Sequence, residues 1–139
     1  VLDLGCGSGI LSIAALRLGA ESAFACDIDE KCVDVAYENA ALNGIGKDRY
    51  TVRWGDVLTD AALRQEMGAG YDIVVANIVA DVIMGLSPHV RPFLKSGGLF
   101  LCSGIIDDRA AEVLEKLKAD GWDVFEQRSS EGWFSYLCK

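Results

Sequence analysis

The sequence predicts an α/β fold, a doubly wound sheet that is mostly parallel and ends in an antiparallel hairpin. Short apolar runs alternate along the chain with segments of helical periodicity, which is the pattern of repeated strand–helix units. Residues 73–76 and 99–102 are apolar on both faces, as strands of a parallel sheet covered by helices are. Residues 122–139 instead alternate between polar and apolar, which is typical of an antiparallel pair.

The elements follow one another in a regular order. Strands are expected at 1–4, 22–28, 50–56, 71–77 and 97–104, and helices at 11–19, 30–44, 78–94 and 107–121. The stretch after the third strand is polar as far as Gly70. Gly19, Gly44 and Gly121 stand where left-handed residues close helices. The last two strands are separated by Ser129 to Gly132, a loop short enough only for a hairpin.

Length and charge limit the possible functions. A chain of 139 residues with 51% hydrophobic content suffices for one packed domain, so we expect a single core. Thirteen basic against 21 acidic side chains give a formal charge of -8. Binding through nucleic-acid phosphates needs clustered Lys and Arg, so direct nucleic-acid binding is disfavoured, whereas a basic protein partner is compatible.

The cysteines and the lack of a long apolar stretch predict the compartment. The five cysteines form no CxxC pair and are odd in number, so they predict reduced thiols and neither a disulfide framework nor a zinc site. No apolar stretch reaches the roughly 18 residues of a membrane span, and we expect a cytoplasmic protein with no membrane partner and no metal.

Val1 already belongs to an apolar strand, from which we expect the chain to be part of a longer protein.

Three glycines mark the connection between the first strand and the first helix. Gly5, Gly7 and Gly9 allow the backbone to approach a ligand closely at the point where doubly wound folds bind nucleotides, although a merely tight turn is the simpler alternative. A dinucleotide fingerprint has its third glycine five residues after the first. Here the interval is four, and Asp3 precedes the set.

The stretch DLGCGSG, from Asp3 to Gly9, resembles the first motif of class I methyltransferases that use S-adenosylmethionine. That cofactor carries a carboxylate and no phosphate, which suits a loop that offers main-chain donors and a helix dipole but no lysine. The resemblance implies a Rossmann-like methyltransferase sheet, with Asp3, Gly5 and Gly7 in the cofactor site and Gly5 against the methionine part.

Acidic residues at the ends of the next two strands are the candidates for the rest of the cofactor. Asp27 lies 22 residues after Gly5 and ends the second strand, where a carboxylate can accept both hydroxyl hydrogens of a ribose. Asp29 and Glu30 are rivals, but Asp29 is better placed to cap the following helix. At the end of the third strand, the resemblance implies that Asp56 accepts from the adenine amino group. Its alternative role is a helix cap or a turn residue.

The fourth strand ends at Asn77, at the edge where the methyl group would be transferred. Enzymes that methylate planar amino groups commonly carry Asn or Asp there followed by Pro-Pro and an aromatic residue. This chain continues Ile78-Val79-Ala80 instead, which favours a flexible alkyl amine. Asn77 is the candidate catalytic residue and a further cofactor contact. Its alternative role is to cap the helix that follows.

The segments GSGILSIAALRLGA, CDID, ENAALNG, ANIVADVI, LKSGG and LCSGII together resemble the catalytic domain of the PrmA family, the methyltransferases of ribosomal protein L eleven. The resemblance covers nearly all of residues 1–139. It implies methylation of lysine side chains and of an N-terminal amine of a basic, lysine-rich ribosomal protein, and an additional N-terminal domain that recognises this substrate.

Methyl transfer needs a neutral amine in line with the methyl carbon and a site from which water is excluded, so Asn77 would position the amine while water removes its proton.

Other residues and functions are weaker candidates. His89, the only histidine, and Cys6 have no partner that the sequence places to activate them. Trp133, Phe134 and Tyr136 either edge a substrate slot or, as is commoner in strands, pack. Methylation of a small molecule or of RNA is the first alternative function, and a nicotinamide-dependent oxidoreductase is the second.

Overall fold

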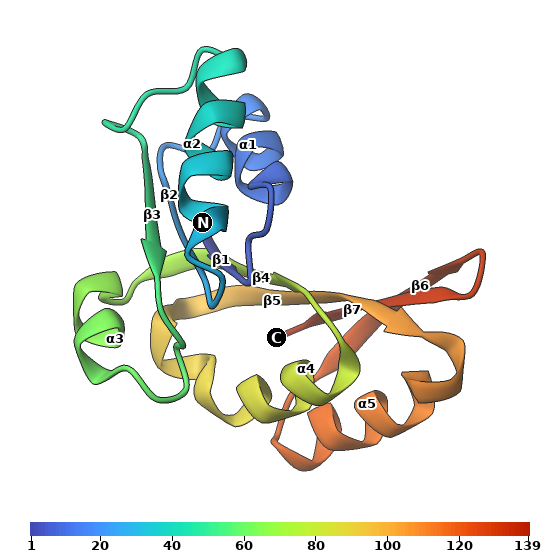
Figure 1. Cartoon of the computed structure of the whole chain (residues 1–139). Helices are drawn as coiled ribbons and strands as arrows, with labels where there is room; N and C mark the ends of the chain where they lie inside the picture. Colours follow the sequence, from blue (N-terminus) through green and yellow to red (C-terminus); the bar gives the residue numbers. More distant parts are fainter. The chain divides into compact units, whose positions relative to one another are not determined.

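The computed structural model describes residues 1–139, and their contacts group into two compact units, Val1–Gly68 and Ala69–Lys139. Figure 1 shows the elements of both units in chain order. The first unit contains β1 (Leu2–Leu4), α1 (Ile10–Arg17), β2 (Ala23–Asp27), α2 (Lys31–Leu42), β3 (Tyr50–Trp54) and α3 (Ala61–Met67). The second contains β4 (Tyr71–Asn77), α4 (Ala80–Leu86), β5 (Leu94–Ile106), α5 (Asp107–Ala119), β6 (Val124–Ser130) and β7 (Trp133–Cys138), with two 3-10 turns at Ser87–His89 and Arg91–Phe93.

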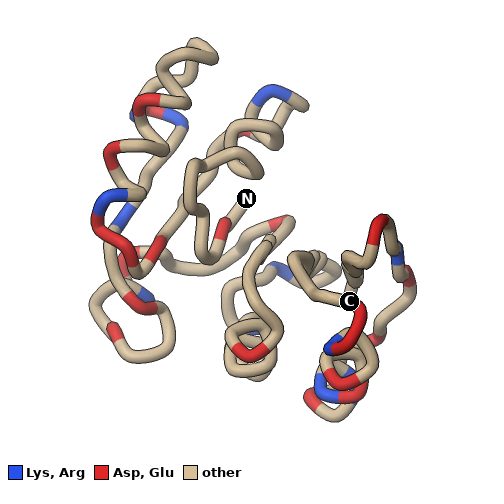
Figure 2. Tube along the Cα trace, turned by 45° about the vertical axis from the view of Figure 1, so that its right-hand side comes forward, with Lys and Arg blue, Asp and Glu red and all other residues tan.

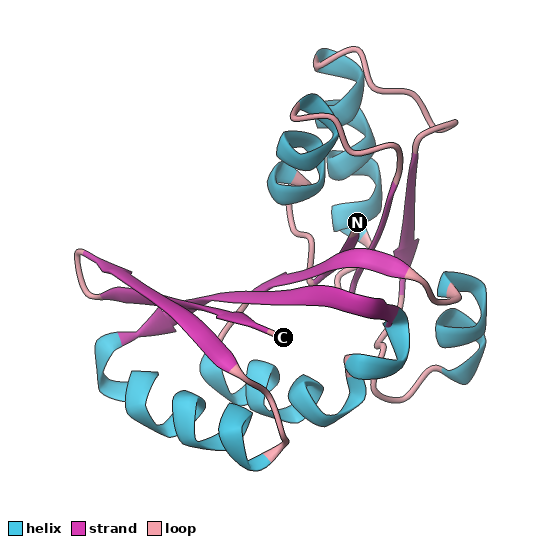
Figure 3. Ribbon diagram, turned by 180° about the vertical axis from the view of Figure 1, so that it is seen from behind, coloured by secondary structure: helices cyan, strands magenta, loops and turns pink.

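The first unit is built on three parallel strands. β2 pairs with β1 on one side and with β3 on the other. α1 and α2 pack against these strands and against each other, side by side in Figures 1 and 3. Alternating small and branched residues of the strands are buried beneath the helices: Leu2, Leu4, Ala25 and Val52. The carboxyl ends of the three strands therefore form one edge, which carries the loops with the predicted cofactor residues.

The second unit joins a parallel pair to an antiparallel hairpin. β4 runs parallel to β5, β5 is antiparallel to β7, and β7 is antiparallel to β6. α4 and α5 lie side by side on one face of this sheet (Figure 3). Tyr136 of β7 is fully buried under α5 and donates its hydroxyl hydrogen to the carbonyl of Ala110 at 2.7 Å. The alternation of strand and helix and the C-terminal hairpin are thus as predicted.

Three details differ from the sequence-based expectation. The helix expected at 78–94 ends at Leu86, and two 3-10 turns lead from it to β5, which already begins at Leu94. The polar stretch before Gly70 contains the helix α3, which Asp60 caps by accepting the N–H of Leu63 at 2.9 Å and which buries Leu63 and Met67. The final loop is shorter than Ser129 to Gly132, because β6 extends to Ser130. Only Glu131 and Gly132 connect the strands, with φ of 51° and 82°. Two consecutive residues with positive φ are typical of a type I′ turn, whose twist matches that of the two strands it connects.

The predicted helix ends are confirmed. Gly44 follows α2 with φ of 70°, and the N–H of Ile45 returns to the carbonyl of Ala40. Gly121 follows α5 with φ of 85°, and the N–H of Trp122 returns to Leu117. In both cases a left-handed residue lets the chain satisfy a free helical carbonyl before the next strand. No helix in the structure combines the length and the apolar character needed to cross a membrane.

Candidate functional site

The glycine loop between β1 and α1 is folded onto the end of β2. The N–H groups of Gly5 and Cys6 both donate to the carbonyl of Cys26, at 2.9 and 3.0 Å. Gly9 stands where α1 meets its neighbours. A Cβ added there would lie 2.8 Å from the Tyr50 hydroxyl and 3.0 Å from Cβ of Ala36. The third glycine therefore lets α1 start close to α2 and β3.

Asp3 holds this loop from beneath. It is 1% exposed, and its Oδ2 accepts both the N–H and the hydroxyl hydrogen of Ser12, at 3.2 and 2.7 Å. Its Oδ1 is buried and has no partner. Burial raises the pKa of the Asp3 carboxyl, and the bonds from Ser12 oppose that rise. Asp3 thus ties β1 to the first turn of α1, a contact with Ser12 that the sequence did not reveal.

Asp27 connects the end of β2 to the glycine loop. Its Oδ2 accepts the N–H of Gly7 at 2.8 Å, and its Oδ1 accepts the N–H of Asp29 at 2.9 Å. The Cys32 thiol also interacts with this carboxylate: burial raises the pKa of Cys32, and the charges of Asp27 and Asp29 raise it further. Asp29 itself accepts the N–H of Lys31, the first residue of α2, at 3.0 Å. These contacts fit the prediction that Asp29 caps α2 and leaves Asp27 as the candidate for the ribose.

The end of β3 lies beside Asp27, since the N–H of Gly55 donates to the Asp27 carbonyl at 2.9 Å. Oδ1 of Asp56 accepts the N–H of Leu58, so Asp56 does serve as a turn residue through one oxygen. Two large apolar side chains flank this edge and were missed from the sequence. Ile28 is 73% exposed and Trp54 is 59% exposed, and the indole N–H of Trp54 donates to the Ile28 carbonyl at 3.1 Å.

These residues of the first unit suit S-adenosylmethionine. Ile10 and Leu11 open α1, where N–H groups have no intrahelical acceptor and favour a carboxylate. Asp27 is a carboxylate acceptor for a diol, and Ile28 offers exposed apolar surface for a flat base. No basic side chain hydrogen-bonds within the loop, which fits a ligand without phosphates. No group of three or more His, Cys, Asp or Glu is arranged to hold a metal ion.

Asn77 ends β4 in the second unit, and it has close neighbours there. Its Cα pairs in register with Ser103 of β5, and the N–H of Ile78 donates to the Ser103 carbonyl at 3.2 Å. α4 begins at Ala80 with Val79 as its N-cap and without a side-chain capping bond, so Asn77 does not cap this helix. Its exposed side chain remains available at the carboxyl end of the strand.

Gly104 shapes the position of Asn77. It has φ of 79° and lies where β5 shifts register against β7. A Cβ added to Gly104 would lie 2.5 Å from Oδ1 of Asn77 and 3.1 Å from both the nitrogen and the oxygen of Ile78. Only a glycine therefore allows β5 to approach the Asn77 carboxamide this closely. Gly104 lies in the segment LCSGII, but nothing in the sequence of that segment indicated that Gly104 would approach Asn77.

The weaker candidates have structural roles or none. Burial raises the pKa of the Cys6 thiol, with the charge of Asp3 adding to the effect, so Cys6 is a poor nucleophile. All five cysteines are free thiols. His89 lies in the 3-10 turn after α4, away from the strand end that carries Asn77. Of the three aromatic residues in β7, Tyr136 is buried, Phe134 is half-buried, and Trp133 is 54% exposed.

Comparison with known proteins places this geometry in a family. The family model described as ribosomal protein L11 methyltransferase (PrmA) matches residues 1–139. The ribosomal protein L11 methyltransferase of Agathobacter rectalis is 43% identical over 140 residues, which cover 100% of this chain and 43% of that protein. Its counterpart in Thermoanaerobacter pseudethanolicus is 44% identical over 139 residues, 100% and 42% of the two chains. The chain thus spans less than half the length of these relatives.

Solved structures agree. The crystal structure of ribosomal protein L11 methylase from Lactobacillus delbrueckii subsp. bulgaricus has a TM-score of 0.88 and 31% identity, over 99% of this chain and 68% of that one. Magnesium protoporphyrin IX methyltransferase from Synechocystis, solved with bound SAH, shares the fold at 18% identity and a TM-score of 0.71, over 99% and 70%. The predicted Rossmann-like methyltransferase fold is confirmed, and the chain belongs to the ribosomal protein L11 methyltransferase (PrmA) family.

Proposed function

We propose that the protein transfers methyl groups from S-adenosylmethionine to amino groups of ribosomal protein L11, both lysine side chains and the N-terminal amine. Residues 1–139 form the catalytic domain in this proposal. The observation that carries it is the bond between the N–H of Gly7 and the Asp27 carboxylate, because it joins the glycine loop to the acid in one site. Family membership supports the reaction and the substrate.

Each predicted residue has a role in the proposed cofactor site. Gly5 and Gly7 give the methionine part access to the main chain, and Asp3 fixes their loop through Ser12. The Asp27 carboxylate accepts hydrogen bonds from the ribose hydroxyls in addition to the one it already accepts from the N–H of Gly7. Asp56 receives the adenine amino group through the carboxylate oxygen that Leu58 does not use. Ile28 supplies apolar surface to the base.

When bound, the cofactor supplies an electrophilic methyl group on a positively charged sulfur. The chain itself then has to orient an amine and keep water from the methyl carbon. Asn77 offers a carboxamide oxygen that accepts an amine N–H, and Gly104 sets where that oxygen lies. No strong base is needed, because the lysine ammonium would lose its proton to water before attack. The neutral lone pair would then form the C–N bond as the methyl–sulfur bond breaks and S-adenosylhomocysteine leaves.

Charge supports a basic protein as the acceptor. The formal charge of -8 attracts a lysine-rich partner and repels nucleic acid, so RNA methylation is the weaker alternative.

A nicotinamide-dependent oxidoreductase is disfavoured by the four-residue interval between Gly5 and Gly9 and by membership of the methyltransferase family. The cytoplasm, where ribosomal proteins are made, is the compartment that this function implies.

Calorimetry and mass spectrometry test the proposal. S-Adenosylhomocysteine should bind and NADH should not. Incubation of L11 with the protein and S-adenosylmethionine should add mass in steps of one methyl group to its amines. Asp27→Asn should weaken S-adenosylhomocysteine binding and slow methylation at limiting S-adenosylmethionine, whereas the matched variant Asp29→Asn, which keeps an acceptor for Lys31, should preserve both. NADH binding without S-adenosylhomocysteine binding would overturn the proposal.

A further inference from the structure

An exposed apolar pair stands at the carboxyl edge of the second unit. Ile106 ends β5 and Trp133 begins β7, and their Cα atoms are paired in the antiparallel register. Ile106 is 46% exposed and Trp133 is 54% exposed, although both sit in regular strands. Neighbouring residues of the same strands, Ile105 and Tyr136, are buried against the helices. The pair therefore adds nothing to that core and presents a large indole to the surroundings.

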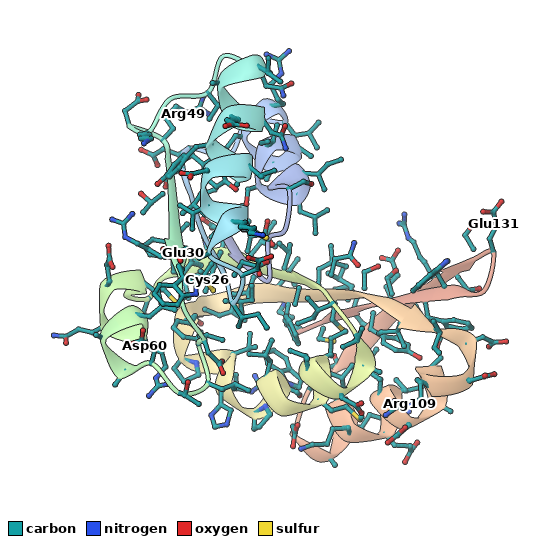
Figure 4. All side chains as sticks on the ribbon, viewed as in Figure 1. Cys26, Glu30, Arg49, Asp60, Arg109 and Glu131 are labelled. Atoms are coloured by element: carbon teal, nitrogen blue, oxygen red, sulfur yellow. The ribbon has the colours of Figure 1, made fainter.

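Three carboxylates lie close to this pair along the chain. Asp107 and Asp108 follow Ile106 directly, and the N–H of Asp107 donates to the Gly132 carbonyl at 2.9 Å, which fixes the first turn of α5 against the hairpin turn. Glu131 occupies that turn, and Figure 4 shows it at the tip of the hairpin. Asp107, Asp108 and Glu131 are all exposed. We name these five residues, Ile106, Asp107, Asp108, Glu131 and Trp133, the edge patch.

The cations near the edge patch are already paired. The guanidinium of Arg109, which is labelled in Figure 4, contacts Asp81 at 2.6 Å and Glu112 at 2.7 Å, so two further acids neutralise it. The Arg128 guanidinium pairs with Glu126. Figure 2 colours the acidic positions of the chain red and the basic positions blue. The three carboxylates of the edge patch consequently have no positive partner within the chain.

We propose that the edge patch docks a basic segment of the protein substrate, with a lysine or arginine of that segment over the face of Trp133 and its charge among Asp107, Asp108 and Glu131. An exposed tryptophan is the side chain that best attracts a cation through its ring, and carboxylates complete the recognition of a positive charge. Nucleic acid and anionic membrane surfaces carry the wrong charge for this patch. This inference rests on the proposed function and adds a substrate-binding surface to it.

The position of the edge patch sets which part of the substrate it holds. Asn77 pairs with Ser103, and Ile106 lies three residues further along β5, so the patch begins about 10 Å from the Asn77 register position. An extended peptide spans a similar distance in about three residues. The docked cation is therefore about three residues away from the amine that is methylated, and the patch selects the sequence around that amine.

Two variants with matched controls test the docking. Trp133→Ala removes the ring, and Phe125→Ala, which truncates a 50%-exposed aromatic at the other end of the hairpin, is its control. The double variant D107N/D108N removes two charges, and Glu115→Gln on the exposed face of α5 is its control. For each protein, Kd for fluorescently labelled L11, Kd for S-adenosylhomocysteine, thermal stability and oligomeric mass are measured.

Trp133→Ala should raise the Kd for L11 about five- to thirtyfold, because an exposed aromatic anchor and its cation contact are lost together. D107N/D108N should also raise this Kd and should flatten its dependence on salt. Neither variant should change the Kd for S-adenosylhomocysteine, and both controls should behave as the unaltered protein.

The outcomes separate this inference from the proposed function. If unaltered protein binds L11 but Trp133→Ala and D107N/D108N bind it equally well, the docking surface is wrong and the function stands. If Trp133→Ala changes the oligomeric mass and not L11 binding, the patch joins two copies of this chain and the inference is overturned. If unaltered protein binds S-adenosylhomocysteine but not L11, the proposed substrate and the docking inference both fail.

Discussion

The substitution Gly104→Ala tests whether β5 sets the position of Asn77. Alanine at φ of 79° costs about 1–2 kcal/mol of stability, because its Cβ crowds the following carbonyl in the left-handed region. The same Cβ would lie 2.5 Å from Oδ1 of Asn77, where ordinary contacts start at 3.4 Å. The carboxamide must therefore retreat by about 0.9 Å, the difference between these two distances.

A displacement of about 1 Å at a group that orients a reacting amine lowers the rate about 100-fold. We expect Gly104→Ala to lower kcat for L11 methylation by about that factor and to leave the Kd for S-adenosylhomocysteine within twofold. Radiolabel transfer and calorimetry measure the two quantities.

The control is Gly97→Ala, in the same strand. Gly97 has φ of 76°, but a Cβ there would meet nothing within 4 Å. It should therefore lose similar stability and keep its activity. Equal kcat for the two variants would refute the role given to Gly104 and, with it, the placement of Asn77 as the amine-orienting group.

Three further predictions concern the first unit. Asp27→Asn should weaken S-adenosylhomocysteine binding by about 10- to 150-fold, since it removes a charged acceptor worth about 1.5–3 kcal/mol, and calorimetry against Asp29→Asn checks this. Gly9→Ala should lower the free energy of unfolding more than Gly7→Ala in urea titrations, because only the Gly9 Cβ collides with Tyr50 and Ala36. The pKa of Asp3 is raised by burial above its ordinary 3.8, so the folded state holds this proton to higher pH and its contribution to stability falls as pH rises through that interval. Asp3→Asn should lack this component when urea unfolding is measured across pH 3.5–7.

Patterns that depend on local order were predictable from the sequence. The place of Asp27 at the end of β2 was predictable, because an acid directly after a short apolar strand, at a fixed interval from the glycine loop, has to lie at the carboxyl edge of a parallel sheet. The hairpin was found from alternation and a short gap. Asp29 was separated from Asp27 because a residue just before a helical period is a capping residue.

Features that depend on register between strands were not predictable. The approach of Gly104 to Asn77 arises from a local shift of β5 against β7, which no period in the sequence encodes. Trp133 and Tyr136 are three positions apart and so lie on opposite faces of β7, but only the packing of α5 decides which of the two faces is buried. The helix α3 escaped notice because it has only seven residues and two buried ones, and its start depends on the Asp60 cap.

The most direct test of the central claim is intact-mass spectrometry of L11 incubated with the protein and S-adenosylmethionine. We predict a ladder of masses separated by one methyl group, located by fragmentation on lysine side chains and the N-terminal amine, and strongly reduced with Asp27→Asn at limiting S-adenosylmethionine. Unmodified L11 from a preparation that binds S-adenosylhomocysteine, or methyl groups found on another class of atom, would contradict it.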